Sequence, residues 1–443
     1  MAQRWRLNPC DYMFLSYDQM MTARGRIGHS TLMVLDLEGE IEPERLRTAI
    51  GRAIERHPIT NARVRYSRLS GRPFWEACHT VDDGVLRVVD LRGAEDWEAA
   101  TADELARFLA APMAVERVAP IRIEYYPGRN RRGKLALRWS HALTDGEGAQ
   151  WFLSEVAQCD GGTGQPSAGL ASADELIDPL ASWSFLKRMR LFLSGFRAHS
   201  EYGAVPRTTL GNEDAADSAE LRIHFRRFDE AEFETIRTNA KRTCPAGPGL
   251  YARFLAGCVI CAVHQLCEER GLHTPAYLVT LPISVRPSGA RPLAGNYLVF
   301  ATLCGRREQA TDPRVLARDL HEQMLRFQLE DRGAAMWALL QVTAWMRARQ
   351  YRRLLRNPFG LPPYVSGFSY YGDSGPAIEQ FVGARVTNLY GVAPLAAPPG
   401  WNPIFSRCGS HLNFALTWLR GYIADETALD FAHRIQTNAL CAG

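Results

Sequence analysis

The sequence predicts an α+β fold, an α/β sandwich, that is built as two lobes. The chain of 443 residues is long enough for two domains or for one large fold with two lobes. Segments with the two-residue apolar period of strands alternate along it with segments that have the period of amphipathic helices. A loop-like, glycine-rich segment at 159–179 separates two halves. We therefore predict an N-terminal lobe at 1–160, a linker with a covering helix at 161–215, and a C-terminal lobe at 216–443.

Composition and charge exclude several classes of protein. With 46% hydrophobic and 23% charged residues the chain is globular in composition, and no apolar run approaches the 18 residues that a membrane span needs. The net charge of +4 is too small to indicate a nucleic-acid partner. The N-terminal residues 1–6 lack the apolar core of a signal peptide, so we expect a cytoplasmic protein.

Ten cysteines are scattered through the chain without the pattern of a small disulfide scaffold, which predicts free buried thiols. Cys258 and Cys261 have the one zinc-like spacing, but they lie in an apolar periodic run at 254–266. No second pair completes a tetrahedral site there. The sequence therefore predicts no metal site.

The first half of the chain yields a series of strands and helices. The helix at 43–55 is marked by a proline in its first turn and by Leu46, Ile50 and Ile54 on one face. The other predicted elements are a buried strand at 31–37, a hairpin at 75–89 around Asp82-Asp83-Gly84, a helix at 99–109, and two strands at 120–126 and 134–138 joined by a basic turn at 128–133.

The last of these strands leads into the stretch that carries the candidate chemistry, Trp139-Ser140-His141-Ala142-Leu143-Thr144-Asp145-Gly146, and a helix is predicted at 149–156. A histidine at a strand end can accept a proton near neutral pH. Asp145 can fix the backbone around it, and Gly146 permits the tight turn that follows. From these residues alone, His141 is equally a candidate base and a structural histidine that caps the strand.

The linker carries a predicted helix at 183–197 that is rich in aromatic, leucine and arginine residues. We favour the interpretation that it covers an apolar groove of its own protein, with peripheral contact to a membrane surface as the alternative. The remaining predicted elements are helices at 230–242 and 250–269, a buried strand at 276–281, and a long helix at 334–356. The basic end of that last helix either meets a phosphate or an acidic partner, or complements the helix C-terminus.

Three motifs in order carry a resemblance to a known superfamily. The first is His-x-x-x-Asp-Gly at 141–146, the second is Arg286-Pro287 after a strand, followed by a Gly295-Asn296 turn into another strand, and the third is the order of segments from 365 to 418. Together they resemble the condensation-domain-like superfamily of thioester-dependent acyltransferases. Stand-alone condensation enzymes and wax-ester synthase/diacylglycerol acyltransferase-like members are the most similar. The plant-enzyme Asp-Phe-Gly-Trp-Gly motif is absent, which argues against that branch.

The resemblance implies two chloramphenicol acetyltransferase-like lobes with a tunnel between them, closed by strands that cross over from the C-terminal lobe. It implies His141 as the general base. Many members carry two consecutive histidines, and here Ser140 occupies the first position. Arg286 would pair with Asp145 and, with Gly146, support the site structurally. The remaining candidates for the tunnel or substrate are Ser140, Asn296, Ser366 and Asn413. Turn formation alone would explain Asn296 equally well.

The activity implied by the resemblance is transfer of an acyl group from a CoA or carrier-protein thioester to a hydroxyl acceptor in natural-product or lipid metabolism. No metal and no bound cofactor are expected, because acyl-CoA or a phosphopantetheinyl carrier protein serves as co-substrate. One alternative is a stand-alone condensation enzyme that forms an amide from a carrier-bound acyl group. Another is a non-catalytic module that recruits a carrier protein.

Overall fold

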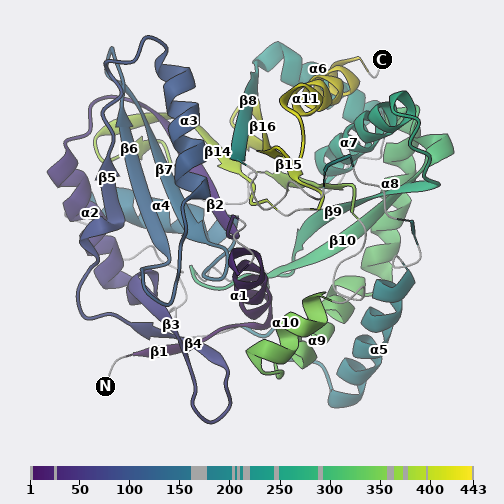
Figure 1. Ribbon diagram of the computed structural model, residues 1–443, viewed down its shortest axis with the longest axis horizontal. Coiled ribbons are helices and arrows are strands. Elements are labelled where there is room, and N and C mark those ends of the chain that lie inside the picture. The colour runs from purple at the N-terminus through teal and green to yellow at the C-terminus, as the bar shows by residue number, and fades with distance from the viewer. Residues whose placement is uncertain are drawn as a thin grey trace.

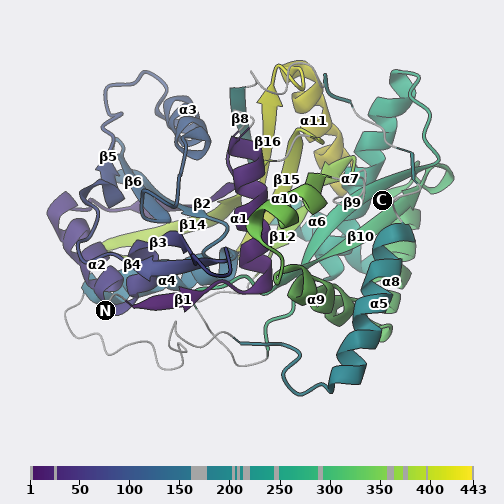
Figure 2. The ribbon, with the colours of Figure 1, turned by 60° about the horizontal axis from the view of Figure 1, so that its bottom comes forward.

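The computed structural model describes residues 3–23, 27–160, 177–201, 205–206, 210–212, 220–243, 249–287, 293–356, 364–372, 378–395 and 398–441. Most of the predicted boundary at 159–179, and much of the predicted linker at 161–215, lie outside these residues. Two lobes lie side by side, with helix α1 (Pro9–Thr22) between them (Figures 1 and 2).

The N-terminal lobe is organised around a sheet of six strands. Its order is β13 (Gln380–Phe381), β14 (Ala384–Val392), β2 (Ser30–Glu38), β7 (Arg132–Ser140), β6 (Ile121–Pro127) and β5 (Leu86–Val88). Only the β5–β6 pair is parallel. Because β14 comes from the last quarter of the chain yet pairs with β2, the C-terminal part of the chain crosses into this sheet.

Strand β2 is buried on both faces, which explains why its sequence is nearly continuously apolar. Met33, Leu35 and Leu37 belong to the core shared with helices α2 (Pro43–Arg56) and α4 (Gly146–Asp160). Leu32 and Val34 belong to a second core that α3 (Trp97–Ala110) shares with the C-terminal lobe. The two cores therefore meet across the central strands, which fixes one lobe against the other.

The C-terminal lobe contains two smaller sheets and a layer of helices. One sheet has the order β12 (Ser369–Tyr371), β15 (Trp401–Cys408), β16 (His411–Arg420) and β8 (Glu220–Phe228), and the other has the order β10 (Leu298–Arg306), β9 (Ala276–Ser284) and β11 (Ser366–Gly367). The helices that cover them are α6 (Glu230–Thr243), α7 (Leu250–Glu269), α8 (Pro313–Leu329) and α11 (Asp425–Leu440) (Figure 1).

Helix α7 is long and apolar enough to cross a membrane, but 89% of its most apolar window is buried inside the fold. It packs between α8 and α11, as the core helix of a globular lobe does. Cys258 and Cys261 both lie in this helix as free thiols, and burial raises the pKa of each.

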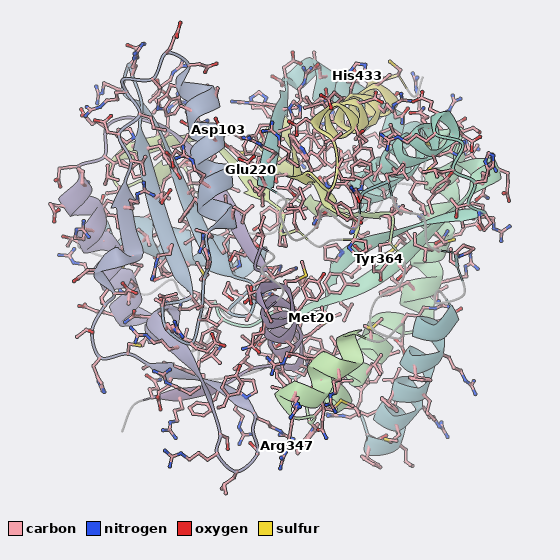
Figure 3. The ribbon with its side chains drawn as sticks, viewed as in Figure 1. Met20, Asp103, Glu220, Arg347, Tyr364 and His433 are labelled. Atoms are coloured by element: carbon pink, nitrogen blue, oxygen red, sulfur yellow. The ribbon has the colours of Figure 1, made fainter. Side chains whose placement is uncertain are left out.

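The lobes also meet at their rim. Arg222 of β8 donates to Glu220 Oε2 at 3.0 Å and, across the lobes, to Asp103 Oδ1 of α3 at 3.3 Å. Figure 3 shows Asp103 and Glu220 close together at this edge, and Met20 on α1 further down between the lobes.

Two predictions of secondary structure are wrong. The hairpin expected at 75–89 does not form, because β4 (Pro73–Ala77) pairs with β1 (Arg4–Arg6) and β3 (Ala62–Tyr66), whereas β5 joins β6 in the large sheet. A local turn signal cannot show that its flanking strands choose partners in different sheets.

The helix expected at 334–356 is two helices, α9 (Arg332–Thr343) and α10 (Ala348–Arg356). The break lets α10 turn onto α1, where Tyr351 stacks on Tyr12 with ring centroids 5.1 Å apart. Packing against α1 therefore overrides a continuous helical period.

A matched pair of glycine substitutions tests how tightly the first turn of α4 is packed. A Cβ at Gly148 would overlap Thr144 Oγ1 and Leu293 O, whereas a Cβ at Gly51 in α2 meets nothing within 4 Å. We expect Gly148→Ala to lower the free energy of unfolding by roughly 1–3 kcal/mol or more. Gly51→Ala should raise it by about 0.5–1 kcal/mol. Urea denaturation measures both, and equal stabilities for the two variants would contradict the packing described.

Candidate active site

His141 immediately follows β7, at the end where Ser140 pairs with Ser30 of β2. Its backbone amide donates to His29 O at 3.3 Å, which continues the pairing of the two strands. The side chain is buried, and its ring stacks on Phe14 of α1 with centroids 3.9 Å apart and planes 16° apart. The histidine is thus held between the central sheet and the helix between the lobes.

Asn296 determines which ring nitrogen of His141 carries the proton. Its Nδ2 donates to His141 O at 2.6 Å and to Asp11 Oδ1 at 2.8 Å, so both amide hydrogens are used on oxygen acceptors. Its Oδ1 therefore faces His141 Nδ1, 2.9 Å away, as an acceptor. Nδ1 must then donate, and in the neutral ring Nε2 holds the free lone pair. The network therefore favours the tautomer of His141 that carries its proton on Nδ1.

Asp11 holds Asn296 in place from α1. Its Oδ1 accepts from the backbone amide of Asn296 at 2.7 Å as well as from the side chain. Its Oδ2 accepts from the backbone amide of Asn8, whose side chain in turn accepts from the amide of Asp11, a capping box that begins α1. Burial raises the pKa of Asp11 to about 7, although the three hydrogen bonds that it accepts oppose the shift.

Burial also lowers the pKa of His141 below its ordinary value of 6.5. Loss of solvation penalises the imidazolium, and hydrogen bonds to the backbone, the nearby charge of Asp145 and the bond to Asn296 only partly offset that penalty. His141 is therefore neutral, and able to accept a proton, at neutral pH.

The structure brings Asp145 and Arg286 together, with side chains that are each 4% exposed. Arg286 Nη2 lies 2.8 Å from both carboxylate oxygens. Asp145 also accepts from the backbone amides of Gly148 at 3.1 Å and Tyr297 at 3.2 Å. The carboxylate thus fastens the start of α4 to the segments around β9 and β10. Because the orienting bond at His141 Nδ1 comes from Asn296, this arrangement is not that of a catalytic triad.

The Gly295-Asn296 turn is locked onto the motif loop. Gly295 N donates to Leu143 O at 2.8 Å, and Thr144 Oγ1 donates to Leu293 O at 2.6 Å. Gly295 has φ of +95°, and a Cβ there would lie 3.0 Å from Asn8 Nδ2. Glycine is therefore required both by the backbone and by the close approach of α1.

Other predicted site residues lie in different surroundings. Ser140 is buried, and its Oγ accepts from the Ala142 amide at 3.3 Å. Asn413 of β16 exchanges hydrogen bonds with Asn388 of β14, which also donates to Asp36. Asp36 lies six residues along β2 from the end that carries the motif, about 20 Å of strand.

Ser366 of β11 donates to the carbonyl of the next residue at 2.6 Å. Among the described residues, neither Ser366 nor Asn413 forms a hydrogen bond with His141. The structure therefore separates these two candidates from the network around the motif.

His29 is a site residue that sequence reasoning missed. Its ring lies 5.3 Å from the His141 ring and 5.2 Å from Phe14, and its buried Nδ1 has no hydrogen-bond partner among the described residues. Burial and the neighbouring His141 lower its pKa well below the ordinary range. A single histidine before a strand carries no sequence signal, and only the register of β2 on β7 places it here.

Two surface hollows of about 580 and 530 Å³ lie away from His141. The first is lined mainly by residues of α7 and α11, including His264, His433 and Arg434, and Figure 3 shows His433 at the top of the C-terminal lobe. The second lies along α5 (Phe185–Glu201).

In the described part of the chain, no group of three or more His, Cys, Asp or Glu side chains could hold a metal ion. The tunnel expected between the lobes stays a prediction.

The fold is that of solved condensation domains. The first condensation domain of the calcium-dependent antibiotic synthetase, in complex with a substrate analogue, matches 99% of this chain and 96% of that domain, with a TM-score of 0.73 and 17% identity. The condensation domain of the Monacolin K polyketide synthase matches 99% of this chain and 97% of that domain, with a TM-score of 0.65 and 13% identity. A mutant starter condensation domain of rhizomide synthetase, in complex with C8-CoA, matches 99% of this chain and 95% of that domain, with a TM-score of 0.68 and 14% identity.

No family model and no curated protein matches the chain in sequence. At these identities the similarity of the structures establishes the fold. The predicted α+β architecture with two chloramphenicol acetyltransferase-like lobes is therefore confirmed.

The role of Asn296 can be tested without a substrate. We expect Asn296→Ala to release the His141 ring, so that the tautomer protonated at Nδ1 no longer dominates. The measurement is the pair of ¹⁵N shifts of His141 in protein labelled at histidine, assigned by comparison with His141→Gln. His433→Gln, which removes an exposed histidine on α11, is the matched control and should leave those shifts unchanged. Wild-type protein that is protonated at Nε2 would contradict the assignment.

Proposed function

We propose that this protein is an acyltransferase that moves an acyl group from a CoA or carrier-protein thioester to a hydroxyl acceptor. The observation that carries the proposal is the buried His141 imidazole, whose Nδ1 is engaged by Asn296 so that Nε2 remains as the base. The condensation-domain fold supports this chemistry, and the C8-CoA complex of the rhizomide synthetase domain supports a thioester donor.

The reaction follows from the free lone pair on His141 Nε2. The acceptor hydroxyl donates its proton to Nε2 as its oxygen attacks the thioester carbonyl. The tetrahedral intermediate then collapses, the carbon–sulfur bond breaks, and the imidazolium returns the proton to the departing thiolate. No acyl-enzyme forms. Ser140 is not proposed as a nucleophile, because its hydroxyl already accepts from the Ala142 amide and no nucleophile elbow surrounds it.

The oxyanion needs hydrogen-bond donors near the motif loop. The backbone amide of Gly148 already donates to the Asp145 carboxylate and is not available to an oxyanion. The backbone amides of Asp145 and Gly146 are therefore the proposed donors.

The donor would meet basic side chains on α10. Arg349 and Arg353 are exposed there, while Arg352 donates to Gln19 of α1 at 3.1 Å. α10 therefore presents positive charge beside the helix whose Phe14 stacks on His141. Such a surface suits either the phosphates of CoA or the acidic surface of a carrier protein. We propose a cytoplasmic location, where both donors occur.

Amide formation is the second candidate, because the solved domains with this fold include condensation domains of synthetases. An amine acceptor would lose its proton to the same Nε2. A strict requirement for a carrier-protein donor over CoA would favour this candidate. A non-catalytic role in recruiting a carrier protein is the third.

The direct test measures release of free thiol from panels of acyl-CoAs and acyl-carrier proteins, with alcohol and amine acceptors. We expect His141→Ala to lower turnover by about 10²–10⁴-fold, since it removes the general base. His433→Ala, an exposed histidine on a distant helix, should retain wild-type turnover. If wild type is inert across the panel while it and His141→Ala bind a carrier protein equally well, the recruitment role replaces the catalytic one.

The pH dependence of kcat/KM gives a second test. Because burial lowers the pKa of His141, its neutral form persists as the pH falls below 6.5. The acidic limb of the profile should therefore lie below pH 6.5, and rates should fall as the pH drops through the lowered pKa. A further inflection near pH 7 would belong to Asp11 and should vanish in Asp11→Asn. A limb of His141 above pH 6.5 would contradict the proposed environment.

A further inference from the structure

Helix α5 is fastened to the C-terminal lobe by one face only. Gly195 lets it approach α9 so closely that a Cβ would lie 2.6 Å from Ala335 O. Leu191 is buried in the same apolar cluster as Phe14 and Tyr297, which flank the site. Arg188 pairs with Asp178, which also accepts from Gln341 of α9. The inner face thus covers an apolar surface of the protein, as the sequence predicts.

The outer face of α5 is apolar and open to solvent. Five large side chains on it are between 41% and 74% exposed, namely Phe185, Leu186, Met189, Leu193 and Phe196. At 100° per residue, four of them lie within an arc of about 80°, and they extend over roughly 17 Å of helix. We call these five side chains the α5 stripe. A contiguous apolar surface of this kind on one helix marks an interaction site rather than scattered exposure.

Positive charge borders the α5 stripe. Arg190 and Arg197 are exposed along one edge of it, and Lys187 is exposed at the start of the helix, with its Nζ 3.5 Å from the centre of the Trp183 ring. From 185 to 197 the helix contains four basic residues and no acidic one. An apolar stripe beside an arginine border, with an aromatic and a lysine at the helix entrance, is typical of helices that lie in the plane of a membrane interface.

We propose that the α5 stripe docks on the surface of an anionic lipid bilayer. A bilayer offers both the apolar layer that the stripe needs and the negative charge that complements its basic border. A second copy of the chain is disfavoured, because pairing two α5 helices face to face would bring their arginines together. This proposal does not rest on the acyl-transfer chemistry, since no residue of the stripe belongs to the network of His141.

Vesicle co-sedimentation of the full chain tests the proposal. We expect binding to vesicles of phosphatidylcholine and phosphatidylglycerol in equal parts, weaker binding to pure phosphatidylcholine, and loss of binding with added salt. Leu193→Gln/Phe196→Gln should weaken binding at least about tenfold, because two apolar side chains no longer enter the interface. Arg190→Gln should weaken binding only to the anionic vesicles.

Leu429→Gln, which alters a comparably exposed leucine on α11, is the matched control and should bind as wild type does. Circular dichroism should show equal helix content in all variants, and turnover with soluble substrates should be unchanged. Absence of binding to anionic vesicles at low salt would overturn the proposal. So would unchanged binding by Leu193→Gln/Phe196→Gln, or a dimer in solution that this variant dissociates, which would make a second copy the occupant.

Discussion

The side-chain amide of Asn296 is the contact on which the rest of the site depends. It joins three segments that are distant in sequence, namely the start of α1, the loop after β7 and the turn before β10. Because Asn296 is fully buried, each of its polar atoms would cost about 1–3 kcal/mol if it lost its partner. The two lobes must therefore close in one geometry for the histidine to be oriented at all.

Two carboxylates divide the work of supporting this geometry. Asp145 pairs with Arg286 and fastens the motif loop, whereas Asp11 contacts the ring of His141 only through Asn296. A neutral amide, unlike the carboxylate of a triad, does not stabilise the imidazolium by direct charge. Burial therefore keeps the pKa of His141 below its ordinary value, and the charge of Asp145 only partly offsets that effect. In the proposed reaction, a low pKa favours return of the proton to the leaving thiolate.

Apolar periods predicted many of the regular elements, whereas a contact between distant segments was predicted only where a family resemblance implied it. β2, α2, α7 and the β6–β7 pair follow from apolar periods, and the Asp145–Arg286 pairing follows from a family resemblance. The bond between Asn296 and His141 spans 155 residues, and turn formation explained the asparagine equally well. The break between α9 and α10 was missed because its cause is Tyr351 stacking on Tyr12, more than 300 residues away.

The pairing of β2 with β7 explains why His29, and not the residue at 140, places a second imidazole beside His141. Adjacent residues at a strand end point to opposite sides, so an imidazole at 140 would not lie beside the ring of His141. His29 does, because it directly precedes Ser30, the first residue of β2, which pairs with Ser140. The backbone of His29 therefore meets that of His141, and the second imidazole comes from the residue just before β2.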